Sequence, residues 1–241
     1  MIKHYPNLFE NQNFKIMLKH TSYFLGLLLI LFLAQTATAQ IGIKAGINLA
    51  SLSEEPAESS IQDFEEESIL GFQAGLVAEI PISEGFAIQP EFLWVQKGGR
   101  RNYTLDGSGY EQRVIYNHVQ IPVLAKVKAG ATDGSGLGLY FFGGPFVGYA
   151  LDGRVEQELT IAGATTESEF DIEFDDDDNQ RRIDWGATFG LGMNLGALFV
   201  DLRYDLGINN ILDEDANNNN DNDPYLRTRG IGLTAGFVFG K

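Results

Sequence analysis

Apolar and polar residues alternate one by one over most of the chain beyond residue 40. In residues 198–208, for example, Leu198, Val200 and Leu202 alternate with Asp201 and Arg203. A period of two is typical of a β-strand with one face in an apolar environment, because successive side chains point to opposite faces. The pattern recurs in eight segments, each near the ~9–11 residues of a tilted membrane strand, at residues 41–50, 69–80, 86–97, 114–128, 138–151, 183–194, 198–208 and 229–239.

The connections between these segments alternate in length. Three of them are short, at residues 81–85, 129–137 and 195–197, and four are long and polar, at residues 51–68, 98–113, 152–182 and 209–228. Outer-membrane barrels combine short periplasmic turns with longer external loops. The sequence therefore predicts an all-β fold, an eight-stranded antiparallel up-and-down transmembrane β-barrel with both chain ends on the short-turn side.

The polar face of these segments is expected to line the barrel interior. Small side chains help a narrow barrel to pack, and glycine occupies this face at positions 42, 46, 75, 186, 190, 192, 230, 232 and 236. Both signs of charge occur on the same face, so its members are able to pair internally. We predict a lumen charge network of Lys44, Glu79, Glu91, Lys97, His118, Lys126, Asp184, Asp201, Arg203 and Asp205. Residues 138–151 are apolar on both faces, and their sides stay unassigned.

The alternative is a soluble lipocalin-like barrel, in which the apolar face lines a ligand cavity. Aromatic residues on the apolar face favour the membrane instead, because they lie near strand ends. Phe86 and Phe239 lie at the short-turn end, and Trp94, Trp185 and Tyr204 lie toward the long-loop end. Such positions are typical of interfacial girdles. We therefore expect localisation in a bacterial outer membrane, with outer-membrane lipid as a partner.

The first 39 residues have the three-part pattern of a secretory signal peptide. Lys19 and His20 precede the apolar run 25–33, and the small residues Ala37 and Ala39 follow it. The run is too short for the roughly 20 residues of a membrane-spanning helix. We predict a signal peptide at 1–39, with Met17 as a plausible true start, and an outer-membrane β-barrel domain at 40–241.

The mature segments also resemble the PorT-like family of small outer-membrane β-barrel proteins. The resemblance rests on residues 43–48 (IKAGIN), 89–92 (QPEF), 96–98 (QKG), 120–124 (QIPVL), 143–145 (GGP), 148–149 (GY), 201–204 (DLRY) and 207–208 (GI). It implies the barrel fold and suggests a role as a component or accessory of a protein secretion machine. It supplies no shared catalytic motif.

Composition and motifs offer little material for catalysis or nucleic-acid binding. The formal net charge of −16 argues against the nucleic-acid backbone as a partner. The chain has no cysteine, so it has neither a disulfide framework nor a thiolate metal site. Beyond residue 39 the sequence has one histidine, His118, which is expected to form hydrogen bonds in the lumen. A lumen-based enzyme built on an Asp/His pair is the weaker alternative.

Two acidic stretches lie in the expected external loops. The simpler interpretation is that these stretches are solvated loops. The more specific one is a calcium site, because Asp oxygens are hard ligands. The EF-hand spacing is absent. The candidate ligands for divalent cations are Asp175, Asp176, Asp177, Asp178, Asp213, Asp215, Asp221 and Asp223.

The sequence thus predicts a non-enzymatic outer-membrane barrel without a cofactor. Its lumen is expected to be plugged and charged, and its role to be a surface, interaction or structural one. Another envelope protein is the expected protein partner.

Overall fold

The computed structural model describes residues 39–55, 65–105, 108–130, 137–172, 174, 181–212 and 225–239. Residues 1–38 of the expected signal peptide, with the proposed start at Met17, lie outside the described residues, as do all eight candidate calcium ligands. Among the residues described, no helix is long and apolar enough to cross a membrane.

The described chain consists of β-strands and their connections. Ten strands follow one another: β1 (Gln40–Glu55), β2 (Glu65–Glu67), β3 (Ile69–Ser83), β4 (Phe86–Leu105), β5 (Ser108–Gly130), β6 (Leu137–Ile161), β7 (Ala164–Asp171), β8 (Ile183–Leu195), β9 (Leu198–Gly207) and β10 (Tyr225–Val238).

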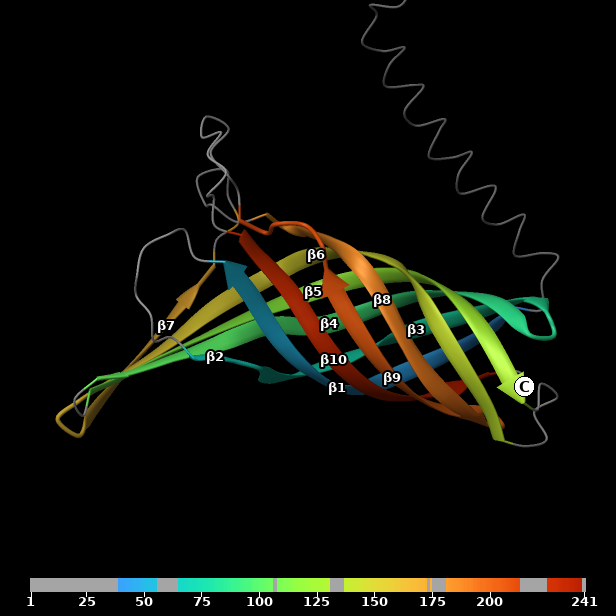
Figure 1. The fold of residues 1–241 in the computed structure, drawn as a ribbon, viewed down its shortest axis with the longest axis horizontal. Helices are drawn as coiled ribbons and strands as arrows, with labels where there is room; N and C mark the ends of the chain where they lie inside the picture. Colours follow the sequence, from blue (N-terminus) through green and yellow to red (C-terminus); the bar gives the residue numbers. More distant parts are fainter. Residues whose placement is uncertain are drawn as a thin grey trace, which may run out of the picture. The chain divides into compact units, whose positions relative to one another are not determined.

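Eight of the strands pair with their neighbours in chain order and close into a ring (Figure 1). The order is β1-β3-β4-β5-β6-β8-β9-β10, and β10 returns to β1 through pairs such as Gly42 with Val238. Every pairing in the ring is antiparallel. The predicted eight-stranded up-and-down barrel is therefore confirmed, and its first and last strands pair along nearly their whole length.

Apolar side chains cover the outside of this ring. Phe72, Leu76 and Leu191 are 56%, 53% and 51% exposed, whereas the intervening Gln73 is buried. A contiguous apolar surface of this kind is not left in water by soluble proteins. The exposed band is the lipid-facing surface. The lipocalin-like alternative is wrong, because it requires the apolar face to line the interior.

The prediction of long loops at 98–113 and 152–182 was wrong for most of the described residues, which form strands. Strands β4, β5 and β6 continue past the ring and join β2 and β7 in a sheet of order β2-β4-β5-β6-β7, which we call the projecting sheet (Figure 1). The part of β4 beyond the ring, from Gly98 to Leu105, extends about 26 Å at ~3.3 Å per residue. Polar residues occupy both faces there, so the hydrophobic alternation disappears although the strands continue.

The structure also assigns the two faces of residues 138–151. Tyr140, Phe142 and Phe146 on β6 are buried in the lumen, and the odd-numbered residues between them face outward. Across the β6–β8 ladder, these three aromatic residues lie directly opposite Gly192, Gly190 and Gly186. The inward glycines of β8 therefore make room for the aromatic rings of β6.

Replacing Gly192 with alanine is expected to destabilise the barrel by about 1–3 kcal/mol. A Cβ atom at this position would lie 2.4 Å from the Tyr140 ring and 2.6 Å from the Val200 carbonyl oxygen. The measurement is urea unfolding of the purified protein in lipid vesicles. Gly109→Ala is the matched control, since the nearest atom to its Cβ is 4.0 Å away. Equal stabilities of the two variants would contradict the close packing described for the lumen.

Candidate functional site

All ten residues of the predicted lumen charge network are buried, each 5% exposed or less. They come from six strands of the ring, so the network joins strands far apart in the sequence. The structure arranges them in layers along the barrel axis, and the layers differ in how completely the charges are paired.

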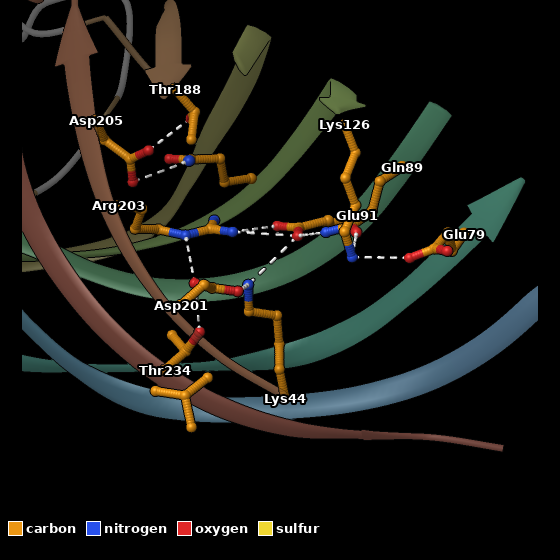
Figure 2. A network of polar contacts seen from close by, with 12 residues as sticks. Lys44, Glu79, Gln89, Glu91, Lys126, Thr188, Asp201, Arg203, Asp205 and Thr234 are labelled. Carbon is orange, nitrogen blue, oxygen red and sulfur yellow. Dashed lines mark hydrogen bonds and ion pairs between the residues drawn. The ribbon is translucent and has the colours of Figure 1, made fainter. Parts of the chain in front are cut away.

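The central layer surrounds the carboxylate of Glu91 on β4 (Figure 2). Arg203 on β9 donates to both Glu91 oxygens, at 2.8 and 3.1 Å. Lys44 on β1 donates to Asp201 at 2.9 Å and to Glu91 at 3.3 Å. Thr234 on β10 donates to Asp201 at 2.7 Å. Two cations and two carboxylates therefore neutralise one another where no side chain of the four is more than 1% exposed.

The layer toward the short-turn end surrounds Glu79 on β3. Lys126 and Lys128 on β5 both form ion pairs with Glu79, and the Lys126 nitrogen lies 2.7 Å from the carboxylate. Lys126 also donates to the Gln89 amide oxygen at 3.0 Å, and Gln89 donates to Glu91 at 2.8 Å. Gln89 thus connects this layer to the central one.

The layer toward the long-connection end surrounds Asp184 on β8. Lys97 and Thr228 each donate to Asp184 Oδ2 at 2.7 Å. His118 lies edge-on to Tyr116, with ring centroids 6.0 Å apart. Its Nδ1 atom has no hydrogen-bond partner among the described residues, so its expected role as a lumen hydrogen-bonder stays a prediction.

Asp205 is held by neutral groups. Thr188 donates to its carboxylate at 2.5 Å and Gln120 at 3.3 Å. No ion pair of Asp205 is present within the described part of the chain. The three charged residues of this row on β9 therefore differ in their partners. Asp201 and Arg203 form ion pairs, whereas Asp205 accepts hydrogen bonds from a hydroxyl and an amide.

Apolar clusters lie toward both ends of this charged interior. Val77, Phe199 and Val238 pack together at the short-turn end. Tyr116, Ile211 and Leu226 pack together at the other end, supported by the partly buried Leu52, Val114, Ile172, Phe174 and Leu212. Side chains of the charged layers and of these clusters thus occupy much of the described lumen, as expected for a ring of eight strands.

The lumen aromatic residues were not identified from the sequence. The signal that could have found them is the matching spacing of Tyr140, Phe142 and Phe146 with Gly192, Gly190 and Gly186. Aligning the two segments as antiparallel neighbours pairs each aromatic residue with a glycine. Neither segment shows this when it is considered alone.

The outward face changes from apolar to charged where the strands leave the ring. The projecting sheet carries five ion pairs on this face, each between partly exposed side chains: Arg100 with Glu67 and with Glu111, Arg113 with Glu156, and Arg154 with Glu156 and with Glu169. The hydrogen bond that Arg100 donates to Glu67 raises the pKa of the Arg100 guanidinium. Charges in this number cannot lie in hydrocarbon, so the projecting sheet begins at the membrane surface.

One row across the projecting sheet consists of like charges. Glu111 on β5 lies directly opposite Glu158 on β6, and Glu158 lies opposite Glu167 on β7. The adjacent row places Glu156 opposite Glu169. Directly opposed like charges destabilise a strand pair. This face of the sheet therefore carries an excess of carboxylates that Arg100, Arg113 and Arg154 do not balance.

The geometry offers no assembled catalytic or metal centre in the portion of the chain that the structure describes, where no group of three His, Cys, Asp or Glu residues is placed to hold a metal ion. A closed ring with a lipid-facing apolar wall and a packed polar interior defines a small outer-membrane β-barrel. Residues 33–213 match the family described as "Outer membrane protein beta-barrel domain", so the chain belongs to this family and to the bacterial outer membrane. No curated protein matches the chain.

Solved structures of small outer-membrane proteins are similar to this chain at low sequence identity. Ail, the attachment invasion locus protein of Yersinia pestis, is 11% identical, covers 83% of this chain and 99% of its own, and gives a TM-score of 0.37. Neisserial surface protein A is 14% identical with the same coverages and a TM-score of 0.37. OprG from Pseudomonas aeruginosa is 10% identical, with coverages of 85% and 98% and a TM-score of 0.39.

Replacing Arg203 with alanine is expected to destabilise the barrel by about 3–5 kcal/mol, because Glu91 loses its strongest partner in a buried site. The measurement is again unfolding in vesicles. Adding Glu91→Gln to the Arg203→Ala variant should restore much of the loss, since the buried charge is then removed. Arg113→Ala is the control: its pair with Glu156 is partly exposed and should contribute less than ~1 kcal/mol. Equal losses for Arg203→Ala and Arg113→Ala would show that the lumen charges are hydrated.

Proposed function

We propose that the protein is a non-enzymatic, non-conducting surface protein whose partner-binding part is the projecting sheet. The packed lumen supports the first half of this proposal, because charged layers and apolar clusters occupy it throughout the described residues. The outer-membrane barrel then serves as an anchor. What it presents beyond the membrane is the projecting sheet.

The observation that carries the binding role is the exposed edge strand β7. All eight of its residues are exposed, and among the residues described it pairs only with β6. The far side of β7 therefore has unpaired main-chain donors and acceptors, which form a template for a further strand. A partner segment in an extended conformation could bind there by β-augmentation.

The charges of β7 specify the chemistry of that segment. Glu167, Glu169 and Asp171 share one face of the strand, and Thr166 and Ser168 lie on the other. A second copy of β7 would place carboxylates opposite carboxylates, which is unfavourable. A segment with Lys or Arg at every second position would neutralise them and also relieve the repulsion between Glu158 and Glu167. The favoured partner is another envelope or extracellular protein with such a basic extended segment.

A role as an accessory of a protein secretion machine is the second candidate. It rests on the resemblance to the PorT-like family in residues such as 43–48 and 120–124. In that case the partner on β7 is another component of the machine. The identity of the cross-linked protein in the following experiment distinguishes the two candidates.

A photo-reactive amino acid at Thr166 or Ser168 should cross-link to a protein in intact cells. Leu233, which is 48% exposed on the lipid-facing wall, is the control position and should yield no protein adduct. The Glu158→Gln/Glu167→Gln variant should reduce the adduct severalfold, because its carboxylates attract the basic segment. An absence of protein adducts at both β7 positions, or an adduct that is indifferent to the two glutamates, would refute the proposed role.

A further inference from the structure

Four polar side chains form a compact group on the outer wall where β1 and β10 approach the long-connection end. The β1–β10 register places Ser51 directly opposite Arg229 and Ser53 directly opposite Arg227. The intervening Leu226 and Thr228 are buried in the lumen, so Arg227 and Arg229 face outward. Alternate residues on a strand are about 6.7 Å apart. The group therefore presents two guanidinium groups and two hydroxyl groups on one side of two adjacent strands.

Neither Arg227 nor Arg229 has a carboxylate partner among the described residues. Arg203 is paired in the lumen, and Arg100, Arg113 and Arg154 are paired on the projecting sheet. Arg227 lies over the Tyr225 ring at 4.3 Å. Its buried Nε atom has no hydrogen-bond partner among the described residues.

Acidic residues are abundant, yet none of those described is placed against Arg227 or Arg229. Within the described part of the chain, these two guanidinium groups are therefore open to a ligand.

The group begins where the apolar band ends. On the short-turn side of it, Leu49 and Ile231 lie opposite each other and are 47% and 48% exposed. On the neighbouring strand β9, Leu206 lies opposite Arg229. Hydrocarbon therefore contacts the wall directly below the arginines, and the arginines reach the level of the lipid headgroups.

We propose that Ser51, Ser53, Arg227 and Arg229 bind the phosphoryl headgroup of an anionic lipid in the outer leaflet. The planar guanidinium group donates two parallel hydrogen bonds to phosphate oxygens, and serine hydroxyls are further donors. The acyl chains of the same lipid lie along Leu49 and Ile231. Basic groups at the headgroup level attract anionic lipids in general, and the pairing of two arginines with two serines makes this one a defined site.

The two tryptophans of the chain allow a direct test. Trp185 on β8 is 48% exposed on the outer wall, and Ile208 next to it donates its main-chain N–H to the Trp185 carbonyl at 3.0 Å. Two strand spacings, about 10 Å, separate β8 from β10. Trp94 on β4 lies opposite Ala74, in a row that reaches β10 at Ala235, far along the strand from Arg227. Trp185 therefore reports on lipid beside the site, and Trp94 reports on lipid elsewhere.

The experiment uses the folded full-length protein in vesicles of phosphatidylcholine with brominated phosphatidic acid, and in vesicles with the bromine on phosphatidylcholine instead. In the Trp94→Phe variant, quenching of Trp185 should show at least about a fivefold preference for phosphatidic acid. In the Trp185→Phe variant, Trp94 should show no such preference. Adding Arg227→Gln and Arg229→Gln to the Trp94→Phe variant should abolish the preference at Trp185, with circular dichroism confirming that the barrel is folded.

Three results would overturn the proposal. The first is equal quenching of Trp185 by both lipids. The second is a preference at Trp185 that persists without the two arginines. The third is the same preference at Trp94. The last result would mean a general attraction of anionic lipid to the protein and no defined site. Arg229→Lys separates charge from geometry, because lysine keeps the charge and loses the paired donors, so a partial loss of preference is expected.

Discussion

The ion pair between Arg203 and Glu91 determines what the interior of this barrel can be. A ring of eight strands leaves room for side chains and little else. A charge in such a space is costly unless an opposite charge and hydrogen bonds satisfy it. Arg203 therefore requires Glu91, and Glu91 in turn holds Lys44 and Gln89, which lead to Asp201 and Lys126. The glycines and the aromatic rings of the lumen are arranged around this network, since both are needed to fill the remaining space without displacing it.

A packed lumen favours the proposed function on the outer surface of the protein. Strands β4, β5 and β6 serve both parts of the molecule, because the same main-chain ladder crosses the membrane and then continues beyond it. On β5 the outward-facing residues in the lipid-facing part include Ile121 and Val123. In the projecting sheet they include Arg113 and Glu111. The environment selects the residue type at each level, and the hydrogen-bonded ladder does not change. The membrane anchor and the proposed binding part are thus one continuous structure.

The ring itself could be predicted from the sequence because each strand in lipid has one apolar and one polar face. The same logic placed Lys44, Glu91 and Arg203 inside, although it could not say that Glu91 is the centre of the network. Pairing depends on the stagger between distant strands, which no single segment contains. The projecting sheet was missed for a related reason, since in water both faces of a strand can be polar and the alternation is lost.

A bulge in β6 shows why the inward and outward faces of a strand are hard to predict from its sequence alone. Between Asn117 and His118 of β5, the register with β6 shifts by one residue, so that Asp152 and Ala150 are the partners and Leu151 is extra. Even-numbered residues of β6 face inward before this bulge, and odd-numbered residues such as Gly153 do so after it. A rule derived from the first half of the strand therefore gives the wrong face in the second half. A bulge is set by the fit of two strands, and the sequence of one strand does not reveal it.

The central claim is that paired charges and apolar clusters close the lumen, so that the protein acts only through its outer surface. Conductance of the purified protein in a planar lipid bilayer tests this claim most directly. A closed lumen predicts that insertion, verified by recovery of folded protein from the membrane, produces no steady single-channel current. Steady, large single-channel currents from the unmodified protein would contradict the account and would indicate that the barrel is a pore.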